Sequence, residues 1–326
     1  MTFCKNESRP PRALGIILND RCGLRCKHCS LSYDANYRGT SWKIEEGELR
    51  RVILEADASV YRTVIMAGGE PALVPQLLQI GIQACREKGI FSAIVTAPVW
   101  ARTRKSASEF FNRVRGLSIV MLSYDVFHLE FITVEHYANA IQEAKAAGVQ
   151  VFLNMCYSNP EEQASLLAKI AHLQDLIDQI HYQPVLPFGN AAANEATIKL
   201  EKQRVESVED LVKVKRSCVA GNALLNRDGS LYPCCWAAKV DDSPLKFQHM
   251  RGLGFRFSSL LMEEDPAFQS LRDSGLIDSL SPDAAAKAAE LVRGESFVNE
   301  CDLCVRLMKE GSNIFRPLLD AVPEAV

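Results

Sequence analysis

The stretch RCGLRCKHCS, residues 21–30, places Cys22, Cys26 and Cys29 in C-x3-C-x2-C spacing directly after an apolar run, ALGIILN at 13–19. Three thiolates so close together can surround one inorganic cluster from a single loop. They satisfy three irons of a [4Fe–4S] cube and leave the fourth iron open, as catalytic zinc sites keep one position open. A zinc site is the alternative. The stretch therefore predicts a metal centre at the end of a strand.

Short apolar runs alternate with longer amphipathic segments from Ala13 to about Pro187. The expected strands are 13–19, 63–68, 91–97, 117–123, 149–155 and 180–186, with helical segments such as 44–58 and 135–148 between them. Asn159 and Pro160 supply the chemistry of a helix start, and Gly148 ends the preceding helix. Six βα repeats predict an α/β fold, a parallel sheet curved into a partial (βα)6 TIM-type barrel over residues 1–187. In such folds the chemistry gathers at the carboxyl ends of the strands.

A second motif, GGEP at Gly68 to Pro71, follows the second expected strand. Together with the cysteine loop after the first strand, it resembles the radical S-adenosylmethionine (SAM) superfamily, and His28 fills the aromatic position of that family's cysteine motif. The resemblance implies a [4Fe–4S] cluster on Cys22, Cys26 and Cys29. It also implies reductive cleavage of SAM to a 5′-deoxyadenosyl radical that removes a hydrogen atom from an unactivated carbon. A reductant such as flavodoxin or ferredoxin would supply the electron.

The resemblance also assigns the contacts to SAM. The glycine-rich turn, here Gly68, Gly69, Glu70 and Pro71, contacts the methionine amino group, and His28 belongs to the same set. The chemistry agrees, because glycines let backbone carbonyls approach an ammonium and Glu70 adds negative charge.

Polar groups at two later strand ends complete the candidate site. Ser123 and Asp125 lie in SYDVFH (123–128), and Asn154 lies at the end of the fifth run. These side chains would face the barrel mouth and hold SAM or substrate, and a strand end with a helix cap is the alternative. We expect His128 to be a structural hydrogen-bonding group rather than a base.

Residues 188–326 have a different pattern and are expected to form a smaller α/β unit. A loop follows Pro187, a short polar helix is expected over 204–215, and NALLNRDGSLYPCCW (222–236) predicts a hairpin with its turn at Asp228-Gly229. Ser281-Pro282 begins a later helix that Gly294 ends.

A second set of cysteines lies in this region. Cys218, Gly229 and Cys234 stand in C-x10-G-x4-C spacing, and Cys301 and Cys304 form C-x2-C. The arrangement resembles the shortened "twitch" form of the SPASM pattern of peptide-modifying radical SAM enzymes, since no cysteine follows Cys304. The resemblance implies one auxiliary [4Fe–4S] cluster held by the four cysteines. A four-cysteine zinc site is the alternative.

Cys235 is left over when Cys234 is counted as a ligand. Successive side chains of an extended segment point to opposite faces, so Cys235 should face away from the cluster, toward the barrel mouth or into the small unit's core. In a core it would be a small hydrophobe. At the mouth it would be a catalytic thiol that returns a hydrogen atom to a substrate radical. That role needs the protonated form, which burial beside a negative cluster favours.

Several features resemble radical SAM peptidyl epimerases, which convert L- to D-residues in ribosomally made peptides. These features are S-x-D-x-F-H, VLPFGNA, DG-x3-PCC and the late C-x2-C followed by a basic residue, over about residues 14–310. The resemblance implies a peptide substrate and Cys235 as the hydrogen donor. The sequence departs at Asn190, where relatives often carry Arg.

Other functions fit the same residues. Only about a dozen residues precede the first strand, and we expect no leader-recognition domain within them. An epimerase or dehydrogenase acting on a sugar or aminocyclitol is therefore an alternative, as is a peptide cross-linking enzyme with a structural Cys235. A two-cluster electron-transfer protein is a non-enzymatic alternative, although it would not need GGEP.

The composition indicates the cellular compartment and the classes of partner to expect. The net charge of −3 and pI near 6.1 give no general attraction to nucleic acid or anionic membranes. No apolar run approaches the roughly 18 residues of a membrane span, and the N-terminus has no signal-peptide apolar region. Eleven cysteines in such a chain indicate metal or redox chemistry in a reducing compartment. We expect a cytoplasmic protein without nucleic-acid or membrane partners.

Overall fold

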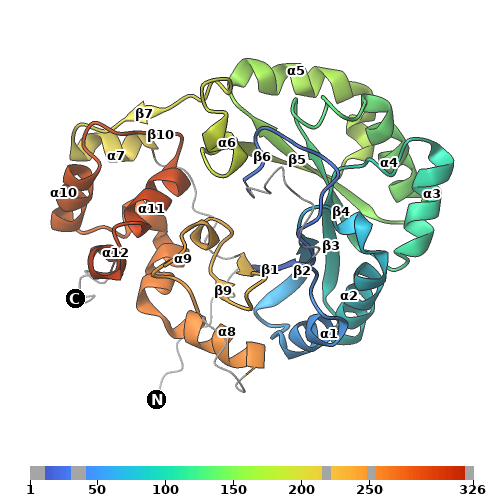
Figure 1. Ribbon diagram of the computed structural model, residues 1–326, viewed down its shortest axis with the longest axis horizontal. Helices are drawn as coiled ribbons and strands as arrows, with labels where there is room; N and C mark the ends of the chain where they lie inside the picture. The colour runs from blue at the N-terminus through green and yellow to red at the C-terminus, as the bar shows by residue number, and fades with distance from the viewer. Residues whose placement is uncertain (1–11, 31–41, 215–221, 248–253, 320–326) are drawn as a thin grey trace.

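The computed structural model describes residues 12–30, 42–214, 222–247 and 254–319. An eight-stranded sheet in the order β6-β5-β4-β3-β2-β1-β8-β9 curves around the interior of the molecule (Figure 1). Its first six strands are β1 (Arg12–Ile17), β2 (Tyr61–Ala67), β3 (Phe91–Thr96), β4 (Ile119–Tyr124), β5 (Gln150–Tyr157) and β6 (Gln179–Pro184). All six are parallel, as the six apolar runs predicted. The sheet is not closed, so the fold is a partial TIM-type barrel.

Five helices cover the outer face of these strands (Figure 1). They are α1 (Glu46–Glu55), α2 (Pro75–Lys88), α3 (Arg104–Arg113), α4 (Val134–Ala146) and α5 (Pro160–Ile170). The side chain of Asn159 caps α5 by accepting a hydrogen bond of 2.9 Å from Glu162 N, and Gly148 follows α4 with a positive φ of 72°. Both helix boundaries are as the sequence predicted.

Alternating side chains of the strands separate two apolar layers. The outward side chains, among them Leu14, Val64, Ile94 and Leu122, are fully buried beneath the helices. The inward side chains form a smaller cluster around Ala93, Ile119 and Met121. The outer layer holds the helices to the sheet, and the inner layer fills the barrel below the strand ends.

The hairpin predicted at 222–236 extends the same sheet. Its first strand, β8 (Ala223–Leu225), pairs parallel with β1, and β9 (Leu231–Tyr232) pairs antiparallel with β8. Gly229 lies in its turn with a φ of 78°, a conformation that favours glycine. The division at residue 187 stays a prediction, and the main sheet includes strands from both sides of it.

The remaining elements are short and long helices and a two-stranded sheet, and those of the C-terminal part gather on one side of the barrel (Figure 1). Short helices are η1 (Pro71–Leu73), η2 (Ala171–Leu176), α6 (Asn190–Ala193), α7 (Val208–Val214) and η3 (Ala237–Lys239). Longer ones are α8 (Gly254–Glu264), α9 (Pro266–Asp278), α10 (Pro282–Leu291), α11 (Glu300–Met308) and α12 (Ser312–Leu319), and β7 (Gln203–Arg204) pairs with β10 (Ser296–Phe297). The polar helix expected over 204–215 begins only at Val208, because Arg204 pairs with Ser296 in that two-stranded sheet. Within the described residues, no helix combines the length and apolar character needed to cross a membrane.

Candidate active site

The cysteine loop follows β1 and is held against the turn after β2. Gly69 N donates to Asn19 O at 2.9 Å, and Glu70 N donates to Arg21 O at 2.6 Å. A Cβ at Gly68 would lie 2.5 Å from Asn19 O, and one at Gly69 would lie 2.1 Å from Arg21 O. The two glycines are therefore required for the backbones of the two loops to touch. Sequence reasoning missed this role and considered only an approach to SAM.

The loop after β6 supports the cysteine loop from the other side. Asn190 N donates to Cys29 O at 2.9 Å, and Asn190 Nδ2 donates to Cys26 O at 3.3 Å. Gly189 has a φ of 59°, and a Cβ there would lie 2.6 Å from Ser30 O. Asn190 thus fixes the backbone between two of the loop cysteines.

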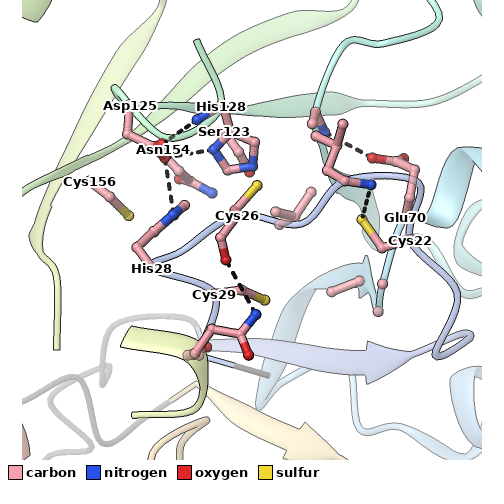
Figure 2. Close-up of a pocket in the computed structure, with 18 of the residues that line it drawn as sticks. Cys22, Cys26, His28, Cys29, Glu70, Ser123, Asp125, His128, Asn154 and Cys156 are labelled. Atoms are coloured by element: carbon pink, nitrogen blue, oxygen red, sulfur yellow. Dashed lines mark hydrogen bonds and ion pairs between the residues drawn. The ribbon is translucent and has the colours of Figure 1, made fainter. Parts of the chain in front are cut away.

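A cavity of about 900 Å³ opens at the carboxyl ends of the strands. Its wall contains all three loop cysteines and all but one of the predicted SAM contacts: Cys22, Cys26, Cys29, His28, Gly68, Gly69, Glu70, Ser123, Asp125 and Asn154. Pro71 is buried at the start of η1, beside the wall rather than in it. The structure therefore brings together residues from four separate strand ends (Figure 2).

The thiols of the loop are close enough to influence one another. Burial, together with the nearby Glu70, Cys26 and Cys29, raises the pKa of Cys22 to about 12, although a hydrogen bond from Leu24 N to Cys22 Sγ at 3.4 Å opposes the shift. An iron centre bound in place of the thiol protons would offset the repulsion between the three negatively charged sulfurs. Three thiols on one cavity wall are the donor set that an iron–sulfur cluster with one open iron requires.

Glu70 is held by the protein itself. Its Oε1 accepts from Ala72 N at 2.9 Å and from Thr96 Oγ1 at 2.6 Å, and its Oε2 accepts from Ala97 N at 3.0 Å. Burial raises the pKa of Glu70 to about 7, against the effect of these hydrogen bonds. The carboxylate thereby ties the turn after β2 to the end of β3.

Asp125 links two histidines at the end of β4 (Figure 2). Its Oδ2 lies 2.7 Å from His128 Nδ1 and 3.2 Å from His28 Nε2. Although burial opposes its charged form, the two rings hold the pKa of Asp125 well below its usual range. Burial likewise disfavours the charged form of His128, yet Asp125 raises its pKa to about 10. The His28 ring also stacks on Phe127, with centroids 4.6 Å apart.

Comparison with known proteins agrees with this geometry. Residues 16–171 match the family model described as the radical SAM superfamily. These residues form a radical SAM domain. The radical SAM fold implies a [4Fe–4S] cluster and SAM, and the three thiols and the surrounding cavity fit that cluster.

The described structure resembles solved radical SAM structures. It matches anSMEcpe with bound AdoMet at a TM-score of 0.53 and 14% identity, over 97% of this chain and 100% of that chain. It matches anSMEcpe with AdoMet and Kp18Cys peptide at 0.51 and 13%, over 95% and 100% of the two chains. Methylornithine synthase (PylB) matches at 0.44 and 14%, over 56% of each chain. At these identities the likeness concerns the fold.

The cysteine doublet after β9 is divided between two environments. Cys235 lines the cavity of the radical SAM domain together with Trp236. Cys234 instead packs, partly buried, against the main apolar core, as do Cys301 and Cys304. Cys301 and Cys304 lie on α11, which contacts η3, and Cys218 lies outside the described residues. The sequence left open which way Cys235 faces, and the structure places it at the barrel mouth.

Sequence reasoning missed several residues of the cavity wall, among them Cys156, Lys239 and Arg25. Cys156 follows Asn154 by two residues in β5, and strand alternation alone could have placed both on one face. Lys239 ends η3, and burial lowers its pKa while nearby Cys235 and Cys29 oppose the shift. Among the described residues neither Lys239 nor Arg25, also in the wall, has an ion-pair partner. These cations gave no sequence signal, since only the fold brings them to the radical SAM domain's cavity.

Proposed function

We propose that this radical SAM protein is an epimerase that converts an L- to a D-residue in a ribosomally made peptide. The observation that carries the proposal is the position of Cys235 in the same cavity wall as Cys22, Cys26 and Cys29. A thiol in the cavity wall can reach a substrate that has lost a hydrogen atom beside the cysteine loop.

In this proposal the cofactors and Cys235 perform separate steps. When bound, the cluster and SAM supply the one-electron chemistry that removes a hydrogen atom from the substrate. Cys235 returns a hydrogen atom from another direction, so that its S–H bond breaks as a C–H bond forms. The Cys235 sulfur radical then needs one electron and one proton to become a thiol again. If bound by Cys218, Cys234, Cys301 and Cys304, an auxiliary cluster would supply the electron, and water would supply the proton.

The protonation of Cys235 suits this role. The side chain is exposed to the cavity, and protein atoms surround the cavity, so burial raises the pKa of its thiol, with Lys239 opposing the shift. Near neutral pH the residue is therefore a thiol and carries the hydrogen that it must donate. A thiolate could not perform the step.

The auxiliary cluster is assigned in this proposal to Cys218, Cys234, Cys301 and Cys304. Cys234 Sγ accepts a hydrogen bond of 3.4 Å from Ala237 N, which parallels the bond from Leu24 N to Cys22 Sγ. Cys301 and Cys304 are three residues apart in the first turns of α11, so they share one face near the positive end of the helix. Both features favour thiolate ligands.

A peptide is the proposed substrate, and flavodoxin or ferredoxin is the proposed reductant. The fold is shared with anSMEcpe, whose solved structure holds a peptide together with AdoMet. That likeness favours a peptide over a sugar or aminocyclitol. The roomy, open mouth above the strand ends gives a peptide segment access to Cys235.

The test compares Cys235→Ala with Cys234→Ala after anaerobic reconstitution with iron and sulfide. With short peptides encoded near the gene as substrates, we expect Cys235→Ala to keep its iron content and SAM cleavage but lose the D-residue product. Cys234→Ala should instead lose part of its iron. In D2O the wild-type product should carry one deuterium at the inverted carbon.

Two outcomes would count against the proposal. Loss of iron in Cys235→Ala, with Cys234→Ala unaffected, would mean that the roles of the doublet are reversed. A product formed in D2O without deuterium would remove the thiol as the hydrogen donor, because a cysteine S–H exchanges with solvent.

A further inference from the structure

The chain after β9 makes a tight turn that divides its side chains between the cavity and the core. Lys239 N donates to Trp236 O at 2.9 Å, which closes the turn of η3. Side chains three residues apart in such a turn lie one above the other, and Trp236 and Lys239 both line the cavity. Ala237, between them, is buried in the main core, and its N–H donates to Cys234 Sγ. Cys235, Trp236 and Lys239 therefore share the cavity side of the turn.

Two cations of the cavity wall have no counter-charge within the described part of the chain. Lys239 and Arg25 both line the cavity, and neither side chain forms an ion pair or a hydrogen bond with another described residue. The two acidic side chains of the wall already have partners: Glu70 accepts three hydrogen bonds, and Asp125 lies against two histidine rings. A half-buried ammonium without a counter-charge is unfavourable. The wall thus offers positive charge to a bound ligand.

SAM accounts for only one of these cations, because it carries a single carboxylate. Arg25 lies within the cysteine loop, where the cluster and SAM would bind. Lys239 lies one turn along the chain from Cys235, the residue that is proposed to meet the substrate. Lys239 is therefore the cation that remains for the substrate. The anionic group of a peptide is a carboxylate, which forms strong charge-assisted hydrogen bonds with an ammonium group.

We propose that Lys239 selects the substrate by binding a carboxylate of the peptide, and so holds the residue to be inverted beside Cys235. At about 2 Å per residue, the turn from Trp236 to Lys239 spans about 6 Å. Neighbouring Cα atoms of a peptide are about 3.8 Å apart. The carboxylate therefore belongs to the inverted residue or to a neighbour of it, as an acidic side chain or as the C-terminus. The inference rests on the proposed function only for the role of Cys235.

The test is the alkylation of Cys235 in the reconstituted protein, kept anaerobic with SAM bound and no reductant. Iodoacetate is an anion and iodoacetamide is neutral, and both react with the thiolate with loss of iodide. The ratio of their rates is therefore independent of the pKa of the thiol. Labelling is measured by tandem mass spectrometry of the proteolytic fragment that contains residue 235. We expect Lys239→Met to lower the iodoacetate-to-iodoacetamide ratio about tenfold, and Lys239→Arg to keep it.

Protection of Cys235 against iodoacetamide identifies the carboxylate. N-acetyl-L-aspartate amide carries a side-chain carboxylate and N-acetyl-L-alanine a terminal one, and N-acetyl-L-asparagine amide and N-acetyl-L-alanine amide are their neutral counterparts. We expect at least one acid to slow the labelling of the wild type more than its counterpart does, and this difference to vanish in Lys239→Met. SAM is bound throughout, so its own carboxylate is not the source. A cation that only balanced the charge of the cluster would not distinguish an acid from its amide.

Lys105→Met is the control, because Lys105 is exposed on α3 at the outer face of the barrel. It should leave both the ratio and the protection unchanged. The proposal is overturned if Lys239→Met keeps the wild-type ratio, if Lys105→Met shows the same fall, if neither acid protects better than its amide, or if Cys235 reacts with neither reagent. If Lys239→Met does not fold, a wild-type ratio equal to that of N-acetyl-L-cysteine amide overturns it. No step requires turnover, so these results stand whether or not the epimerase test succeeds.

Discussion

Replacement of Gly69 by alanine tests the contact between the cysteine loop and the turn after β2. The added Cβ would lie 2.1 Å from the Arg21 carbonyl oxygen and 2.4 Å from the carbonyl carbon. Ordinary contact begins near 3.4 Å, so the two backbones must separate by more than 1 Å. Backbone atoms on both sides leave no flexible side chain to absorb the change.

The cost follows from the bonds that this separation breaks. The bonds from Gly69 N to Asn19 O and from Glu70 N to Arg21 O both cross the contact. At about 0.5–1.5 kcal/mol each, their loss lowers the free energy of unfolding by about 1–3 kcal/mol. Arg21 directly precedes Cys22, so the displacement also moves a predicted iron ligand.

The assay is urea denaturation of the cluster-free protein, followed by iron analysis after anaerobic reconstitution. Gly47→Ala is the matched control, since a Cβ at Gly47 in α1 meets no atom within 4 Å. Alanine there favours the helix and should be neutral or stabilising by up to about 1 kcal/mol. A Gly69→Ala protein with wild-type stability and iron content would refute the steric argument.

Three further predictions concern buried polar groups. Thr96→Val removes the donor to Glu70 Oε1 and the acceptor of a 3.1 Å bond from Trp100 Nε1. We expect it to lower the free energy of unfolding, measured by urea denaturation, by about 1–3 kcal/mol, and Thr96→Ser to lower it by less. Because the folded pKa of Glu70 is raised from 4.5 to about 7, its contribution is fully present below pH 4.5 and is lost as pH rises to about 7. At 1.36 kcal/mol per pH unit this amounts to about 3 kcal/mol, and Glu70→Gln should flatten the pH dependence of unfolding accordingly. Asn299→Ala removes the cap of α11, which accepts from Cys301 N at 2.9 Å, and should cost about 1 kcal/mol that Asn299→Ser restores.

The barrel strands were predictable because each has a local signature. Buried parallel strands appear in the sequence as short apolar runs. The intervening helices are distinguished from them by the helical spacing of their apolar residues. The positions of Ser123 and Asn154 in the cavity wall followed from the same pattern, since the carboxyl ends of parallel strands share one edge. These predictions needed only the order of elements along the chain.

Contacts between distant segments could not be predicted in this way. The bond from Thr96 to Glu70, the clash that Gly69 avoids and the ion pair of His28 with Asp125 each join residues of different chain segments. Nothing in the local sequence of a loop specifies which partner it will meet. Asp125 is an example: its position at the barrel mouth was expected, whereas its use as the anchor of two histidines was not.

The pairing of β8 with β1 explains why the cavity depends on both parts of the chain. Leu224 in β8 and Cys235 after β9 both line the cavity whose other walls come from the first six strands. A partial barrel has an open side, and here the hairpin continues the sheet along that side. The thiol of Cys235 reaches the cavity because β8 pairs with the strand that the cysteine loop follows. The boundary at residue 187 therefore separates two sequence patterns, while the reaction chamber is built across it.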